Sequence, residues 1–177
     1  MKKILGLVVS LTSIAGICAA VLAFINIKTK GPIAEMLVKK ANDAALAVMP
    51  EGVKEVNKTK KGDAEIFEGK DASGKVIGYA TKGKDAGGYG GDIVLMVGFK
   101  ADKKTVVSYK ALVATETPGL GTKLSTPEFY SQFEGKSAAN PFKVKKDGGE
   151  IEAITSATIT SRAVCAAIND AAKILER

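Results

Sequence analysis

Histidine and tryptophan are absent from this 177-residue sequence, and cysteine occurs only twice, at Cys18 and Cys165. Without histidine the chain can form neither a Ser-His-Asp triad, nor a Cys-His nucleophile pair, nor an imidazole metal site. Two cysteines this far apart cannot ligate an iron–sulfur cluster or a structural zinc, and no CxxCH haem motif is present. Any redox chemistry must therefore come from an imported cofactor.

Acidic residues are fewer than basic ones, since 19 Asp and Glu against 26 Lys and Arg give a formal net charge of +7. The lysines are scattered along the chain, with few aromatic residues among them. A nucleic-acid-binding surface would cluster these residue types, so we expect a solvated basic surface and no nucleic-acid partner. The length allows one modest core rather than two.

Charge is missing altogether from the 24 residues between Ile4 and Ile27. As a helix this run would be ~36 Å long, which is enough to cross a hydrocarbon core of about 30 Å. A cleaved signal peptide is the alternative, but its apolar region spans only about 7–15 residues and ends at a small-residue site. A lipoprotein signal at Cys18 would need a small residue where Ile17 stands. We therefore predict a membrane anchor over 1–30 and a domain over 31–177.

The orientation of this anchor is only weakly indicated, because lysines flank the apolar run on both sides. The short amino-terminal segment favours a cytoplasmic N-terminus with the bulk of the chain exported. We expect a single-pass protein of the cell (inner or cytoplasmic) membrane whose C-terminal domain lies on the extracytoplasmic side.

The sequence after the anchor is typical of one α+β domain, with a mostly antiparallel sheet and flanking helices. A 3.6-residue apolar period predicts a helix over 32–47, with Pro32 in its first turn and a breaker at Pro50. Strands are expected over 64–68, 75–81, 92–99 and 105–115, with shorter ones at 143–145 and 151–154. A short helix with a capping box follows Ser125, and the last helix is expected over 161–175 with Thr160 or Ser161 as N-cap.

Three segments carry residues suited to a ligand: GGYGG at 87–91, ETPGLGTK at 116–123 and TSATITS at 155–161. The first is not a dinucleotide fingerprint, because no helix follows it, and a bend before a strand accounts for it. In the second, Pro118 and Gly119 suit a tight turn, which leaves a glutamate, two threonines and a leucine fit for a flat, half-polar ligand. The third has more hydroxyl groups than a cap needs, at a helix end that favours phosphate.

These segments, together with GYGGDIVLMVGF at 88–99 and the apolar N-terminus, resemble the FMN-binding domain family. That family includes the G subunit of Rnf electron-transport complexes and the C subunit of sodium-pumping NADH:quinone reductases, and the short anchor with one compact domain looks more like the former. In the family, a flavin transferase joins FMN through its phosphate to the last threonine of an S-G-A-T-like motif. The matching residue is Thr158. Ser156 stands where the family usually has glycine, and Glu152 where an aspartate is common.

The resemblance implies a set of cofactor-binding residues and a set of partners. The residues are Thr158 as the covalent FMN site, with Thr155, Ser156, Ala157, Thr160, Glu116, Thr117, Gly119 and Leu120 around the cofactor. The chain would be a redox subunit rather than a self-contained enzyme, within a complex of membrane subunits that moves electrons between ferredoxin and NAD and translocates sodium ions or protons. Two alternatives stay open: a stand-alone extracytoplasmic FMN-domain electron carrier, and a membrane-anchored binding or structural domain without flavin.

Overall fold

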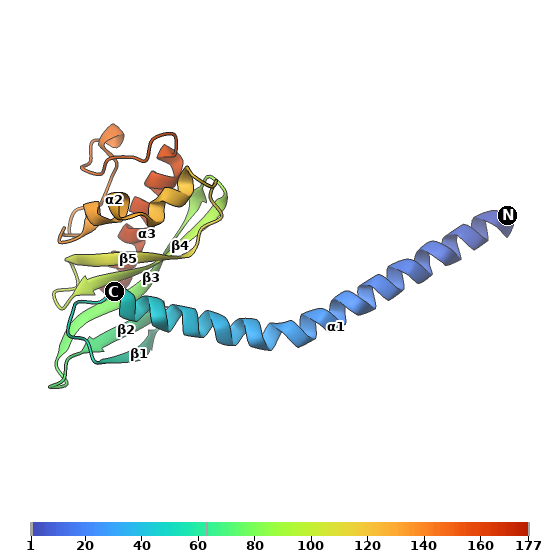
Figure 1. Cartoon of the computed structure of the whole chain (residues 1–177), viewed down its shortest axis with the longest axis horizontal. Coiled ribbons are helices and arrows are strands. Elements are labelled where there is room, and N and C mark those ends of the chain that lie inside the picture. The colour runs from blue at the N-terminus through green and yellow to red at the C-terminus, as the bar shows by residue number, and fades with distance from the viewer. Residues whose placement is uncertain (1, 63, 177) are drawn as a thin grey trace. The chain divides into compact units, whose positions relative to one another are not determined.

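The structure of the protein, a computed structural model, describes residues 2–62 and 64–176 and divides between Lys40 and Ala41 into two compact units (Figure 1). The first unit is formed by most of α1, Lys2–Ala47. The most apolar 18-residue window of this helix has a mean hydropathy of 2.4, and none of that window is buried. By length and composition the helix is able to cross a membrane.

Pro32 lies inside α1, so the prediction that it begins a second helix is wrong. The predicted end of that helix, before the break at Pro50, is confirmed, because α1 ends at Ala47. A proline inside a helix removes one backbone hydrogen bond and tends to kink or break it. The helix nevertheless runs continuously through Gly31 and Pro32, although both residues are poor helix formers.

The second unit is built on a five-stranded sheet in the order β1-β2-β3-β4-β5, in which every neighbouring pair is antiparallel. The strands are β1 Glu55–Lys61, β2 Ala64–Lys70, β3 Val76–Gly88, β4 Gly91–Lys100 and β5 Val106–Val113. The predicted α+β class with an antiparallel sheet is confirmed. Strand β1 is not among the predicted strands because its sequence, EVNKTKK, is a lysine-rich, largely exposed edge without apolar alternation.

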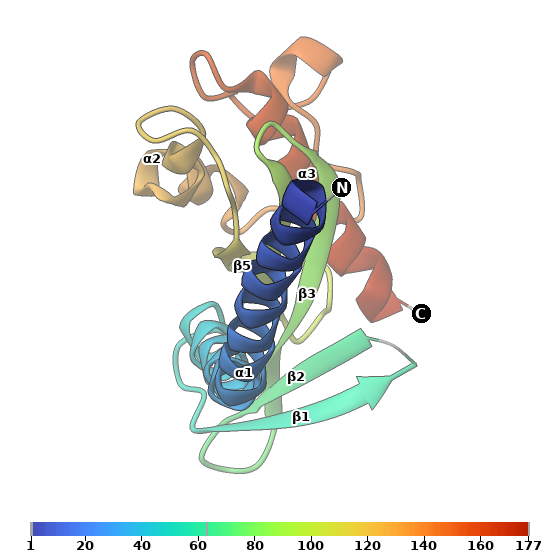
Figure 2. The ribbon, with the colours of Figure 1, turned by 90° about the vertical axis from the view of Figure 1, so that its right-hand side faces the viewer.

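Each face of the sheet carries its own apolar core. Leu95 and Phe99 of β4 face the larger core, which they share with α3, Thr158–Glu176. Met96, which points the other way, lies in a smaller core with the last turns of α1 and with Val48. Figure 2 shows α3, in red, running along β3. The sheet is therefore the middle of three layers, between the end of α1 and α3.

Two glycines let the helical segments approach the sheet closely. A Cβ at Gly83 would collide with the backbone carbonyl of Ala167 in α3. A Cβ at Gly98 would collide with the carbonyl of Val48, just after α1. Gly83 and Gly98 lie on opposite faces, so each face has at least one position where only glycine fits the observed packing.

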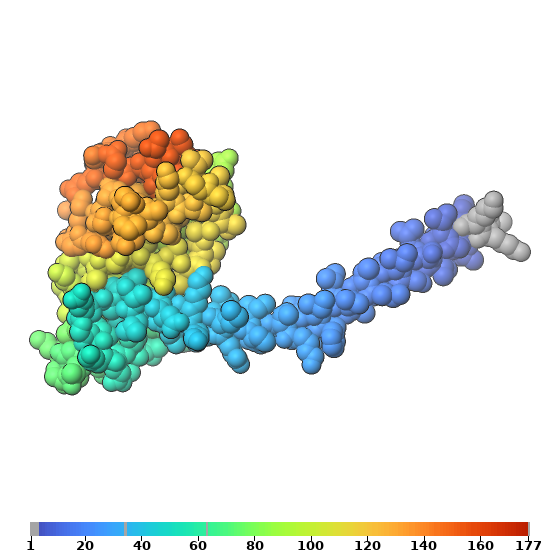
Figure 3. Space-filling view, in the orientation of Figure 1, coloured from blue at the N-terminus to red at the C-terminus, as the bar shows by residue number. Residues whose placement is uncertain are grey.

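The chain between β5 and α3 holds only short elements, and Figure 3 shows its yellow-orange and orange residues gathered at one end of the domain. They are η1 Gly121–Ser125, α2 Pro127–Tyr130, η2 Ser131–Phe133 and η3 Lys145–Asp147. The strands predicted at 143–145 and 151–154 are wrong, because they reduce to a single bridge between Val144 and Ile151. The predicted capping box is not formed either, since the Thr126 hydroxyl donates back to the Lys123 carbonyl oxygen at 3.0 Å.

Helix α3 begins at Thr158, three residues before the start expected from the sequence. Its first helical hydrogen bond runs from the Ser161 N–H to the Ala157 carbonyl at 3.0 Å. Ser161 is not the N-cap, because its hydroxyl accepts from the Ile154 N–H at 2.9 Å and donates to the Ala157 carbonyl. Thr160 is not the N-cap either, because its hydroxyl donates to Glu116. Both hydroxyl groups that the sequence suggested as N-caps therefore form other hydrogen bonds instead.

A tight turn precedes α3 and places Ser156 in a left-handed backbone conformation. The Ala157 N–H donates to the Ile154 carbonyl at 2.9 Å, which closes a four-residue turn. Ser156 is the third residue of this turn and has φ +63°. That position of a type II turn requires a positive φ, which glycine adopts without penalty and L residues adopt at a cost of roughly 1–2 kcal/mol.

We predict that Ser156→Gly stabilises the domain by up to about 1 kcal/mol, because glycine relieves the left-handed strain at the cost of some unfolded-state entropy. Thr155→Gly is the matched control, since Thr155 is equally exposed but has no positive φ, and it should destabilise by about 0.5–1 kcal/mol. Chemical denaturation of both variants measures the two changes. Equal destabilisation by both variants would contradict a strained turn.

Candidate functional site

One cavity of about 470 Å³ is lined by residues from three separate parts of the chain. The lining residues are Tyr89 from the β3–β4 turn, Glu116, Thr117, Leu120 and Gly121 from the segment after β5, and Ser156, Ala157, Thr158, Ile159 and Thr160 from the start of α3. The volume falls in the range of small-molecule and cofactor sites. All three segments singled out from the sequence therefore meet at one place.

Glu116 connects these three segments by hydrogen bonds. One carboxylate oxygen accepts from the Gly90 N–H at 3.1 Å, and the other accepts from the Thr160 hydroxyl at 2.5 Å. Glu116 is only 7% exposed and Thr160 only 1%. A buried carboxylate without partners would cost several kcal/mol, so these two contacts are what allow it to stay inside.

Glycines surround Glu116 because there is no room for side chains beside it. A Cβ at Gly121 would lie 2.6 Å from one carboxylate oxygen of Glu116, and a Cβ at Gly88 would lie 2.8 Å from the other. A Cβ at Gly90 would collide with the carbonyl oxygen of Thr115. Glycine-rich sequence on either side of Glu116 is therefore a packing requirement of this buried carboxylate.

The segment after Glu116 forms the tight turn predicted from Pro118 and Gly119. The Leu120 N–H donates to the Thr117 carbonyl at 3.2 Å, and Gly119, the third residue of the turn, has φ +75°. The Thr122 hydroxyl accepts from the Gly119 N–H at 2.9 Å. This turn holds Thr117 and Leu120 at the cavity wall.

The rim of the cavity is apolar and exposed. Tyr89 is 71% exposed, Leu120 40% and Ile159 48%. After α1, these three residues and Val113 are the large apolar side chains that stand exposed in the described part of the chain. Exposed apolar side chains grouped around one cavity indicate a binding surface, and flat aromatic ligands suit it.

The first turn of α3 supplies polar groups to the same cavity. The N–H groups of Thr158, Ile159 and Thr160 precede the first helical hydrogen bond and have no carbonyl partner within the helix. The half-buried Thr158 lines the cavity at this end. Orphan N–H groups and the positive end of a helix suit a phosphate group. An apolar rim and a phosphate-binding end together fit a flavin mononucleotide.

Seven of the nine residues expected around a cofactor line this cavity. The exceptions are Gly119, which shapes the neighbouring turn, and Thr155, which lines a separate hollow beside Lys123 and Gln132. Sequence reasoning missed Tyr89, Gly121 and Ile159. An aromatic residue among four glycines was a usable signal for Tyr89, whereas no signal marked Ile159, which lay in the hydroxyl-rich segment before the expected helix.

Other redox or metal chemistry is not supported by the side chains that the structure describes. They contain no group of three or more His, Cys, Asp or Glu side chains placed to hold a metal ion. Both cysteines are free, and burial raises the pKa of the Cys165 thiol to about 12. Cys165 therefore stays protonated and unreactive at neutral pH.

Comparison with known proteins finds the FMN-binding domain over residues 88–173. The chain is 30% identical to the G subunit of the ion-translocating oxidoreductase complex of Methanosarcina acetivorans, across 96% of this chain and 93% of that protein. It is 34% identical to the G subunit of the Na⁺-translocating ferredoxin:NAD⁺ oxidoreductase complex of Acetobacterium woodii, across 93% of this chain and 87% of that protein.

Two solved structures share the fold. One is the C subunit of a Na⁺-translocating NADH-quinone reductase from Parabacteroides distasonis, with a TM-score of 0.54, 24% identity and coverage of 70% of this chain and 77% of that one. The other is NqrC from Shewanella oneidensis, with a TM-score of 0.51, 23% identity and coverage of 71% and 66%. These two structures show the fold alone. The sequence relatives show the family: this chain belongs to the FMN-binding domain family, among the G subunits of ion-translocating oxidoreductase complexes.

Proposed function

We propose that this protein carries FMN in the cavity at the start of α3, joined through its phosphate to the hydroxyl oxygen of Thr158, and passes electrons as a membrane-anchored subunit. The observation that supports this most is the position of Thr158 in the first turn of α3, at the polar end of the cavity. A phosphate attached there lies beside the orphan N–H groups, which stabilise its negative charge.

Thr158 is favoured over its neighbours because their hydroxyl groups are occupied or lie elsewhere. The Thr160 hydroxyl is buried and donates to Glu116, and the Ser161 hydroxyl is buried and bonded to the backbone. Thr155 lines a different hollow. Ser156 remains exposed at the cavity, but it lies two residues before the first residue of the helix, outside the turn that carries the free N–H groups. Thr158 combines an available hydroxyl with a phosphate-binding environment.

The rest of the cavity suits the ring of such a cofactor. Thr117 can hydrogen-bond its polar edge, while Leu120, Ile159 and Tyr89 can cover its apolar faces and partly exclude water. Bound FMN supplies the chemistry, because a flavin exchanges one or two electrons and can therefore pass electrons between one-electron and two-electron carriers. The ester bond, formed by a flavin transferase, would retain the cofactor where free FMN is scarce.

The partners that we propose are the other membrane subunits of an Rnf-type complex, which moves electrons between ferredoxin and NAD and couples this to sodium or proton translocation. The relatives named as G subunits of ion-translocating complexes support this assignment. Helix α1 would anchor the domain in the cytoplasmic membrane and so raise its effective concentration near these partners. The domain would lie on the extracytoplasmic side, with a short cytoplasmic N-terminus.

We predict that the wild-type protein, purified from its native host, shows flavin fluorescence that stays with its band on a denaturing gel. Thr158→Ala should abolish this fluorescence, because it removes the ester oxygen. Thr126→Ala, a matched change outside both the cavity and the motif at 155–158, should keep it. Fluorescence that survives in Thr158→Ala would place the attachment elsewhere, and a colourless wild-type protein would contradict flavin binding altogether.

The side of the membrane is tested by labelling single cysteines in intact cells. In a Cys18→Ser background, buried Cys165 stays unlabelled, whereas Ala101→Cys stands exposed in the β4–β5 turn. We predict that a membrane-impermeant maleimide labels Ala101→Cys in intact cells but labels Lys3→Cys only after permeabilisation. The reverse pattern would put the domain in the cytoplasm.

A further inference from the structure

Glu116 is the only charged side chain that is buried within the described residues. The other buried polar side chains are the hydroxyls of Thr81, Thr160 and Ser161. Both oxygens of Glu116 accept hydrogen bonds, from the Gly90 N–H and the Thr160 hydroxyl. These two contacts occupy both oxygens of the carboxylate, and neither partner carries a positive charge that would offset its negative charge.

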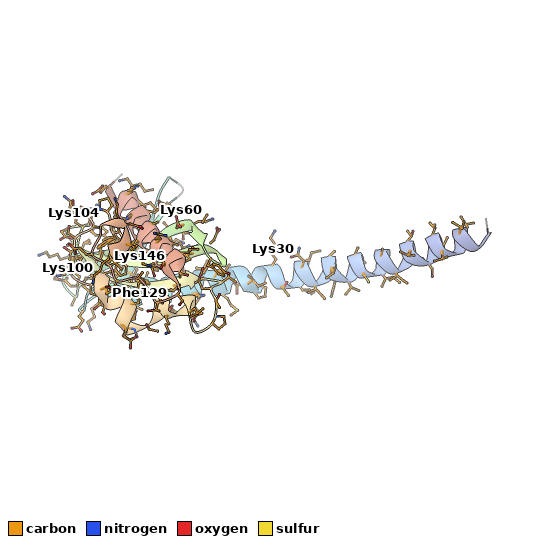
Figure 4. All side chains as sticks on the ribbon, turned by 90° about the horizontal axis from the view of Figure 1, so that it is seen from above. Lys30, Lys60, Lys100, Lys104, Phe129 and Lys146 are labelled. Atoms are coloured by element: carbon orange, nitrogen blue, oxygen red, sulfur yellow. The ribbon has the colours of Figure 1, made fainter. Side chains whose placement is uncertain are left out.

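No lysine or arginine is among the residues that line the cavity, although the chain carries a net charge of +7. The only titratable side chains of the lining are Glu116 and Tyr89. The lysines lie instead on the outer surface, as Figure 4 shows for Lys60, Lys100, Lys104 and Lys146. Exposed charges are strongly screened by salt, whereas a buried carboxylate is screened much less.

We infer that Glu116 makes the cavity electrically negative and thereby lowers the reduction potential of the flavin held there. This inference rests on the proposed function. Reduction adds negative charge to the ring, and a carboxylate in the same small cavity opposes that charge. The positive end of α3 amounts to only about half a charge and lies where the phosphate binds. Among the side chains that line the cavity, Glu116 is therefore the one full charge that would act on the ring.

This electrostatic role is separate from the structural role of Glu116 as a link between segments. Glu116→Gln removes the charge and keeps the shape, since the amide oxygen can still accept from Gly90 and the amide N–H can donate to the Thr160 hydroxyl. Thr160→Val does the opposite, because it deletes one hydrogen bond and leaves the carboxylate charged. A merely structural residue would make both variants behave alike.

The test is a spectroelectrochemical titration of the flavin-loaded full-length chain in detergent, with thermal unfolding recorded for each variant. We predict a wild-type midpoint potential below that of free FMN in the same buffer. Glu116→Gln should shift the potential upward, and Thr160→Val should shift it less, while both lower thermal stability. The shift in Glu116→Gln should persist at high salt, because the carboxylate is buried.

An unchanged or lower potential in Glu116→Gln, or equal shifts in both variants, would overturn the inference. If Glu116→Gln does not fold, the wild-type comparison decides alone, and a wild-type potential above that of free FMN overturns the inference. Failure of the proposed function looks different, because the wild-type chain would then carry no flavin on a denaturing gel.

Discussion

The carboxylate of Glu116 is the interaction on which the site depends. It accepts from Gly90 at the β3–β4 turn and from Thr160 in α3, while it belongs itself to the segment after β5. Three pieces of chain that are far apart in sequence are thereby held around one cavity. The cost of burying this charge is offset by those two hydrogen bonds, and the glycines at its sides make the space that it needs.

The sheet gives this assembly its support. Its larger core packs against α3, and its smaller core packs against the end of α1, so one sheet holds both the site helix and the end of the anchor helix. Gly83 and Gly98 set the close approach on the two faces. The start of α3 is fixed in turn by Ser161, whose hydroxyl bonds to backbone on both sides of the Ser156 turn. Ser156 adopts a left-handed backbone conformation, which explains why the family usually has glycine at this position.

The sequence predicted those features of the fold that depend on neighbouring residues. The turn at Pro118-Gly119, the strand at β4 and the end of α1 followed from residues adjacent in sequence, and the gathering of Glu116, Thr117 and Thr158 followed from a family resemblance. The start of α3 could not be read in the same way, because the Thr160 hydroxyl, which looked like a cap, is bound to a carboxylate 44 residues away. The burial of Glu116 is equally a result of tertiary packing.

The central claim is that Thr158 carries the flavin, and peptide mass spectrometry tests it most directly. Trypsin should release residues 147–162 as one peptide, which contains every hydroxyl residue of the segment before and within the first turn of α3. The account predicts that this peptide from native protein is heavier by one FMN less one water, and that fragmentation assigns the added mass to Thr158. An unmodified peptide, or added mass on another residue, would contradict it.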